Sequence, residues 1–164
     1  MTNEEIINKL RDDKHYYGEF GRQYISNSDI KTILYDPEQF GVPMDENENL
    51  ARGRLFHQLM LEPDKVKDFP LYDGAVRNAS YRQFLQENDL KFALKVSEAD
   101  EVKAMVDWFK SNDNKKTQQI MELIYNKDCR FEEPMVADIL GHKFKGKADV
   151  VNIKDGYIID LKTS

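Results

Sequence analysis

The sequence has little cysteine and lacks long apolar runs. Its 164 residues include one cysteine, Cys129, so no disulfide can form within the chain, and a reducing, cytoplasmic setting is the expectation. No apolar stretch approaches the roughly 20 residues of a membrane-spanning helix, and the first residues lack the basic and then apolar pattern of a signal peptide. No internal repeat is visible. These absences argue against a disulfide scaffold, a helical membrane protein and a repeat array.

Net positive charge is also missing. The formal net charge is −6, and 33% of the residues are charged against 40% hydrophobic. This balance argues against non-specific nucleic-acid binding by bulk charge. It does not exclude a nuclease, because carboxylates that bind a metal count as negative until the metal arrives. A local basic segment near the C-terminus comprises Lys143, Lys145, Lys147, Lys154 and Lys162.

The pattern changes from helical to strand-like along the chain. Residues 1–127 are expected to be mainly helical, with helices over 4–11, 50–61 and 79–87, one capped by Ser97, and a loop over 15–21. From Cys129 onward apolar and polar residues alternate, and Pro134 indicates an edge or bulge position. Residues 128–164 therefore predict a three-stranded sheet. The whole chain is predicted to be one α+β domain, with a helical region followed by an antiparallel or mixed sheet.

The last two predicted strands bring acidic residues together. Asp155-Gly156 predicts a two-residue type I′ turn, in which Lys154 would face Tyr157. Asp149, Asp160 and Lys162 would then share one face of the sheet. The two aspartates would be diagonal neighbours, about 7 Å apart at Cβ. Such a pair can hold one divalent cation with an ammonium group beside it.

The predicted helix over 50–61 carries Gly53 and His57, which are four residues apart and therefore stack on one face. A glycine in a helix costs about 1 kcal/mol relative to alanine. One interpretation is that Gly53 clears space for a group that approaches His57. The alternative is a helix–helix contact at Gly53 and a hydrogen-bonded histidine with no chemical role.

These motifs, in this order, resemble those of the PD-(D/E)xK nucleases of the RecB/RecE-like exonuclease type. The matching segments are Gly53-Arg-Leu-Phe-His57, Gly146-Lys-Ala-Asp149 and Asp160-Leu-Lys162-Thr163. The segment from Tyr24 to Pro37 is similar to the N-terminal part of the phage RecE-like (exodeoxyribonuclease VIII) group. The resemblance implies the fold of restriction endonucleases.

The resemblance also implies roles for individual residues. His57, Asp149, Asp160 and the backbone carbonyl of Leu161 would be metal ligands. Lys162 would position or activate the attacking water, and Glu133 would be an auxiliary acidic residue near the metal or the 5′ end of the DNA. Oxygen ligands suit Mg²⁺, and an imidazole ligand favours tolerance of Mn²⁺.

The activity implied is metal-dependent 5′→3′ digestion of one strand from double-stranded DNA ends, commonly in a ring-shaped homo-oligomer that works with a single-strand annealing recombinase. Family members usually continue past the Asp-x-Lys-Thr motif into a further helix and strands, so the chain is expected to be a truncated form. Two alternatives stay open. One is a catalytically weak or inactive domain that binds DNA ends or a partner, and the other is an endonuclease with the same fold.

Overall fold

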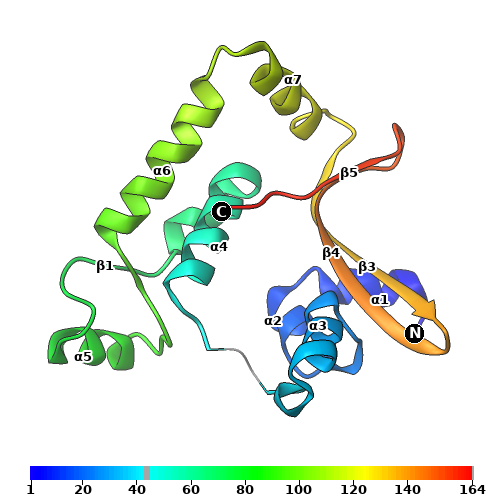
Figure 1. Cartoon of the computed structure of the whole chain (residues 1–164), viewed down its shortest axis with the longest axis horizontal. Helices are drawn as coiled ribbons and strands as arrows, with labels where there is room; N and C mark the ends of the chain where they lie inside the picture. The colour runs from blue at the N-terminus through cyan, green and yellow to red at the C-terminus, as the bar shows by residue number, and fades with distance from the viewer. Residues whose placement is uncertain (43–44, 164) are drawn as a thin grey trace. The chain divides into compact units, whose positions relative to one another are not determined.

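A computed structural model describes residues 1–42 and 45–163 of the chain (Figure 1). Contacts group them into two compact units, each drawing on two separate stretches of sequence. Residues 1–42 and 128–160 belong to unit 1, and residues 45–127 and 161–163 belong to unit 2. Helices and small sheets together make an α+β protein, as the sequence predicted. The single domain expected from the sequence stays a prediction.

Unit 1 combines a three-stranded sheet with helices from the start of the chain (Figure 1). Its strands are β3 (Arg130–Ile139), β4 (His142–Asn152) and β5 (Tyr157–Ile159), in the order β3-β4-β5. Its helices are α1 (Asn3–Leu10), α2 (Asp13–Tyr17) and α3 (Asn27–Tyr35), with 3₁₀ turns at Gly21–Gln23 and Pro37–Gln39. The loop predicted over 15–21 is therefore wrong in part. Asp12 caps α2 by accepting a hydrogen bond from the Lys14 amide.

The N-terminal segment is fixed to the sheet by apolar packing and by the backbone. Ile6, Leu10, Tyr16 and Tyr24 form a buried cluster, and Val136 of β3 packs against it. The backbone of Ile25 bonds to β4 on both sides of Phe144. Its amide donates to the Lys143 carbonyl at 2.9 Å, and its carbonyl accepts from the Lys145 amide at 2.8 Å. The helices of unit 1 thus depend on a sheet formed much later in the chain.

The β3–β4 hairpin keeps one register from Arg130↔Val151 to Ile139↔His142. Its loop is Leu140-Gly141, with φ of 54° and 80°. Two positive φ values in a two-residue loop are the geometry of a type I′ turn, which matches the twist of the flanking strands. Pro134 lies on β3 and pairs with Lys147 of β4. β3 is an edge strand of this sheet. The edge position predicted for Pro134 is confirmed.

The β4–β5 turn differs from the prediction. Asn152 pairs with Tyr157, so four residues, 153–156, form the loop instead of Asp155-Gly156 alone. The buried Asn152 side chain explains the longer loop. Its Oδ1 accepts from the Asp155 amide at 2.9 Å, and its Nδ2 donates to Asp155 Oδ2 at 2.9 Å. The Gly156 amide donates to the Asn152 carbonyl at 2.9 Å. An asparagine that bonds the backbone ahead of it favours this wider turn.

The corrected register also bears on the two aspartates. The last pair of the ladder is Val150 with Ile159, one residue before Asp160, where β5 ends. The new register differs from the predicted one by two residues, and a shift of two preserves the side-chain faces of a strand. The shared face of Asp149 and Asp160 stays a prediction, because Asp160 lies outside the strand.

Unit 2 is mainly helical. Its elements are α4 (Glu48–Leu61), a 3₁₀ helix (Pro63–Asp68), β1 (Leu71–Tyr72), α5 (Ala79–Glu87), β2 (Leu94–Lys95), α6 (Val96–Ser111) and α7 (Lys115–Ile124). β1 and β2 pair in parallel. The core consists of Ala51, Leu55, Phe69, Leu94, Ala99 and Val102. The cap predicted at Ser97 is wrong, because α6 starts at Val96 and the Glu98 carboxylate accepts from the Lys95 amide at 3.2 Å.

We expect Asn152→Ala to lower the free energy of unfolding by about 1–3 kcal/mol, because it removes a buried amide whose hydrogen bonds hold the β4–β5 turn. Urea unfolding followed by circular dichroism measures the change. Ile153→Ala in the same turn is the control. Its side chain is exposed, and its effect should stay within about 0.5 kcal/mol. Equal effects of the two variants would contradict the role given to Asn152.

Candidate functional site

Two carboxylates meet across the β3–β4 hairpin. Asp149 lies on β4 between the buried residues Ala148 and Val150, which fix the strand against the core. Position 132 lies opposite it, between the pairs Phe131↔Val150 and Glu133↔Ala148. A carboxylate oxygen of Glu132 and one of Asp149 lie within 4.8 Å of each other. Both side chains are half-buried. This spacing allows one cation to contact both.

The backbone at Glu132 is unusual for a strand. Its φ is +46°, in the left-handed region that residues with a Cβ seldom adopt. Such a conformation costs of order 1–3 kcal/mol and is concentrated at functional sites. Because the register continues unchanged on both sides, the distortion adds no residue to the strand. Its local effect is confined to the position that faces Asp149.

Glu133, the acidic residue expected near the metal, is engaged elsewhere. Arg11 Nη1 donates to its Oε2 at 2.5 Å and Arg11 Nη2 to its Oε1 at 2.7 Å. Arg130 Nη1 lies 3.5 Å from the same Oε1. The geometry thus favours Glu132 over Glu133 as the carboxylate beside Asp149. Sequence reasoning missed Glu132 because it did not use Leu140-Gly141 to set the register.

In unit 2, the two motifs predicted to cooperate do lie together. His57 Nε2 of α4 lies 3.1 Å from the backbone carbonyl oxygen of Leu161. One helical turn earlier, a Cβ built on Gly53 would have Thr163 Oγ1 as its neighbour at 3.7 Å. Residues 161–163 therefore pass along the Gly53–His57 face of α4. This contact distance is ordinary for a Cβ, so the segment can lie there without a glycine at position 53, and the reason for Gly53 stays open between the two interpretations.

The donor sets of both units fit a hard divalent cation. Glu132, Asp149 and Asp160 supply carboxylate oxygens, which Mg²⁺ and Mn²⁺ prefer. For ligands about 2.1 Å from a metal, two adjacent corners of an octahedron are about 3.0 Å apart. The 3.1 Å between His57 Nε2 and the Leu161 oxygen matches that spacing. Without a metal, the same distance suits a hydrogen bond from a protonated Nε2 to the carbonyl.

Three lysines of the basic segment make contacts with acceptors in unit 1 through their ammonium groups. Lys147 Nζ lies 2.6 Å from Asp13 Oδ1, and Lys154 Nζ lies 2.8 Å from Asp128 Oδ2. Lys145 Nζ donates to the Tyr16 carbonyl at 2.6 Å. Burial lowers the pKa of Lys145. Lys162 belongs to unit 2 and is exposed.

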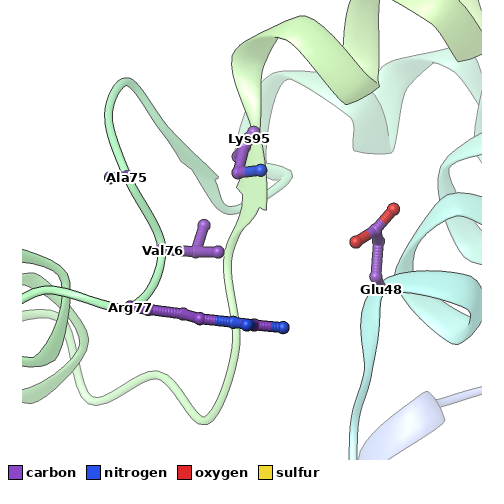
Figure 2. A pocket seen from close by; sticks show the side chains of 5 residues that line it. All are labelled: Glu48, Ala75, Val76, Arg77 and Lys95. Atoms are coloured by element: carbon purple, nitrogen blue, oxygen red, sulfur yellow. The ribbon is translucent and has the colours of Figure 1, made fainter.

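A separate hollow of about 280 Å³ lies in unit 2 (Figure 2). It is lined by Glu48, Ala75, Val76, Arg77 and Lys95. The Lys95 ammonium is paired with Glu98 Oε1 at 3.1 Å. The lining mixes both signs of charge and includes no residue of the three sequence motifs. This hollow is therefore distinct from the predicted site.

An α+β fold with two carboxylates close together on a β-hairpin, and an Asp-x-Lys segment after it, is typical of a protein of the PD-(D/E)xK type. A family model described as a PDDEXK-like domain of unknown function (DUF3799) matches residues 36–164. The chain belongs to this family. Searches of curated proteins and of solved structures found no match. Family membership makes the fold nuclease-like and supports divalent-metal binding.

Among the residues with described positions, no helix is both long enough and apolar enough to cross a bilayer.

We expect Gly53→Ala to preserve the fold and to stabilise it by up to about 1 kcal/mol. The new methyl group meets Thr163 at an ordinary contact distance, and alanine favours a helix over glycine. Gly156→Ala is the contrasting control. It has open space around it but a φ of +73°, so it should destabilise by about 1–2 kcal/mol. Chemical denaturation measures both. A destabilising Gly53→Ala would mean that residues 161–163 pack more tightly on α4 than described.

Proposed function

We propose that this protein is a metal-dependent deoxyribonuclease that hydrolyses phosphodiester bonds of linear double-stranded DNA. The observation that carries the proposal is the pair of carboxylates on the β3–β4 hairpin, Glu132 and Asp149, which have oxygen atoms within 4.8 Å of each other. Membership of a PDDEXK-like family supports it. The ordered motifs at Gly53–His57, Gly146–Asp149 and Asp160–Thr163 support it further.

The proposed ligands are Asp149, Asp160, His57 and the Leu161 carbonyl, and Glu132 joins them on the evidence of its position. Mg²⁺ is the proposed cation, with Mn²⁺ tolerated because one ligand is an imidazole. When bound, the cation supplies a Lewis acid that polarises a phosphate and lowers the pKa of a water. His57 must be neutral at Nε2 to act as a ligand, which makes metal binding weaker as the pH falls.

Lys162 is assigned the role of positioning or activating the attacking water. An ammonium two residues from Asp160 can hold a water or a phosphate oxygen by donating hydrogen bonds. Burial of Val150 and Ala148 beside Asp149 keeps that carboxylate in a fixed orientation.

The finer assignments rest on the sequence resemblance to RecE-like exonucleases. They are 5′→3′ polarity, a role in phage-type recombination or DNA processing, and a ring-shaped homo-oligomer. A single-strand annealing recombinase is the proposed partner, and the cytoplasm the proposed location. The chain would then act on DNA ends and leave one strand for annealing.

The test incubates linear duplex DNA and Mg²⁺ with wild type, Asp149→Asn, Lys162→Ala and the control Lys31→Ala. Wild type and Lys31→Ala should digest the DNA at equal rates. Lys162→Ala should lose about 10²–10⁴-fold in rate, as expected for a residue in proton transfer, while still binding Mn²⁺ in paramagnetic resonance titrations. Asp149→Asn should lose both Mn²⁺ binding and digestion. Equal digestion by wild type and Lys162→Ala would refute the proposal.

Further substrates separate the alternatives. Digestion confined to linear DNA supports an exonuclease, whereas cutting of covalently closed circular DNA identifies an endonuclease. Loss of 5′-label before 3′-label establishes the polarity. Metal-stimulated binding of DNA ends with no product would instead identify a catalytically inactive end-binding domain.

A further inference from the structure

Two arginines converge on one buried carboxylate next to Glu132. Glu133 is 8% exposed at its side chain, whereas those of Arg11 and Arg130 are 46% and 58% exposed. Arg11 binds both carboxylate oxygens, and Arg130 approaches one of them at 3.5 Å. Arg11 comes from the end of α1 and Arg130 opens β3. We call Arg11 and Arg130 the arginine pair and Glu133 its anchor. All three side chains lie in unit 1.

The arginine pair carries more positive charge than its anchor neutralises. Two guanidinium groups face one carboxylate, which leaves a net charge of +1. The contact with Glu133 raises the pKa of Arg11, so this group stays charged at any working pH. Each guanidinium has five N–H donors, of which the anchor uses only one or two. Within the described part of the chain, neither guanidinium group has another hydrogen-bonded acceptor.

Three lysines of the same unit, unlike the arginine pair, have their charge or their donors matched. Lys147 and Lys154 are each matched by one aspartate, and Lys145 is turned onto a backbone carbonyl. These contacts fix lysine side chains in place and use their charge or their donors. The arginine pair instead presents spare donors in a fixed position. Planar guanidinium groups also match phosphate oxygens with two parallel hydrogen bonds.

We propose that Arg11 and Arg130 bind internal phosphodiester groups of duplex DNA, and that Glu133 positions them. The inference rests on the proposed function, since it names the surface that holds the nuclease substrate. Glu133 pairs with Ala148 on the same β3–β4 hairpin that carries Glu132 and Asp149, so the arginine pair is anchored to the hairpin of the candidate metal site. Arg11 lies outside the residues matched by the family model, 36–164.

The geometry explains how a chain with net charge −6 can bind a polyanion. Repulsion from the whole chain is screened beyond about 10 Å at 0.1 M salt, whereas a direct contact is not. The buried anchor restricts the rotamers of two long side chains before DNA arrives, so less entropy is lost on binding. Glu133 is thus a positioning residue, while Arg11 and Arg130 contact the substrate.

The experiment measures binding of a short blunt duplex with 5′-hydroxyl ends by fluorescence anisotropy, in EDTA, over a range of KCl concentrations. Arg130→Gln should bind about 3–10-fold more weakly at low salt, and the slope of log K against log [KCl] should fall by about 0.9, as for one lost phosphate contact. Arg82→Gln on α5 makes the same chemical change at an exposed position and should match wild type.

Arg11→Gln alone leaves a buried carboxylate without its main partner, and the protein is at risk of unfolding. The double variant Arg11→Gln/Glu133→Gln avoids this and keeps the wild-type net charge. It should still lose affinity and salt dependence, because the phosphate contact is gone while the bulk charge is unchanged. Thermal unfolding checks that each variant is folded.

The inference is overturned if Arg130→Gln and the double variant both match Arg82→Gln in affinity and slope, or if wild type binds no duplex at all. Neither result depends on hydrolysis, which is measured separately with Mg²⁺. Active digestion with unaltered binding in the arginine variants would reject this surface and leave the nuclease assignment standing. DNA binding that depends on the two arginines, without any digestion, would support this surface and reject the nuclease assignment.

Discussion

The register of the β3–β4 hairpin is the constraint on which the candidate site depends. It runs unbroken from Arg130↔Val151 to Ile139↔His142 and places Glu132 opposite Asp149. A slip of one residue would send every side chain of one strand to the other face. Val150, fully buried on the same strand, would then leave the core. Apolar burial therefore fixes the relative position of two charged groups that would otherwise repel each other.

Most helices, the α+β class and the three C-terminal strands could be predicted because they follow from local patterns of apolar residues. The turns could not. Asp155-Gly156 has the composition of a type I′ loop, but the side chain of Asn152 stabilises a longer one. Leu140-Gly141 adopts the positive φ values instead. A leucine is a poor choice for that conformation, so the strands, and not the turn residues, must determine where the chain reverses.

The candidate site, too, could be predicted from the sequence only in part. His57, Leu161 and Gly53 could be linked from the sequence because a known motif set connects them, and their contacts in unit 2 agree with it. The choice between Glu132 and Glu133 needed the hairpin register. The partner of Glu133 could not be predicted from the sequence at all. Arg11 is separated from it by 122 residues, and no local pattern reports a contact at that range.

The two-part make-up of unit 1 bears on the order in which a ribosome-bound chain can fold. The core of unit 2 lies between Ala51 and Val102, so these residues can pack as soon as they emerge. Helices α1–α3 are made earlier, yet the strand that covers Ile6 and Leu10 starts at Arg130. At about 5–20 residues per second, they wait several seconds for it. During that interval, apolar side chains at the N-terminus are exposed to chaperones or to neighbouring chains.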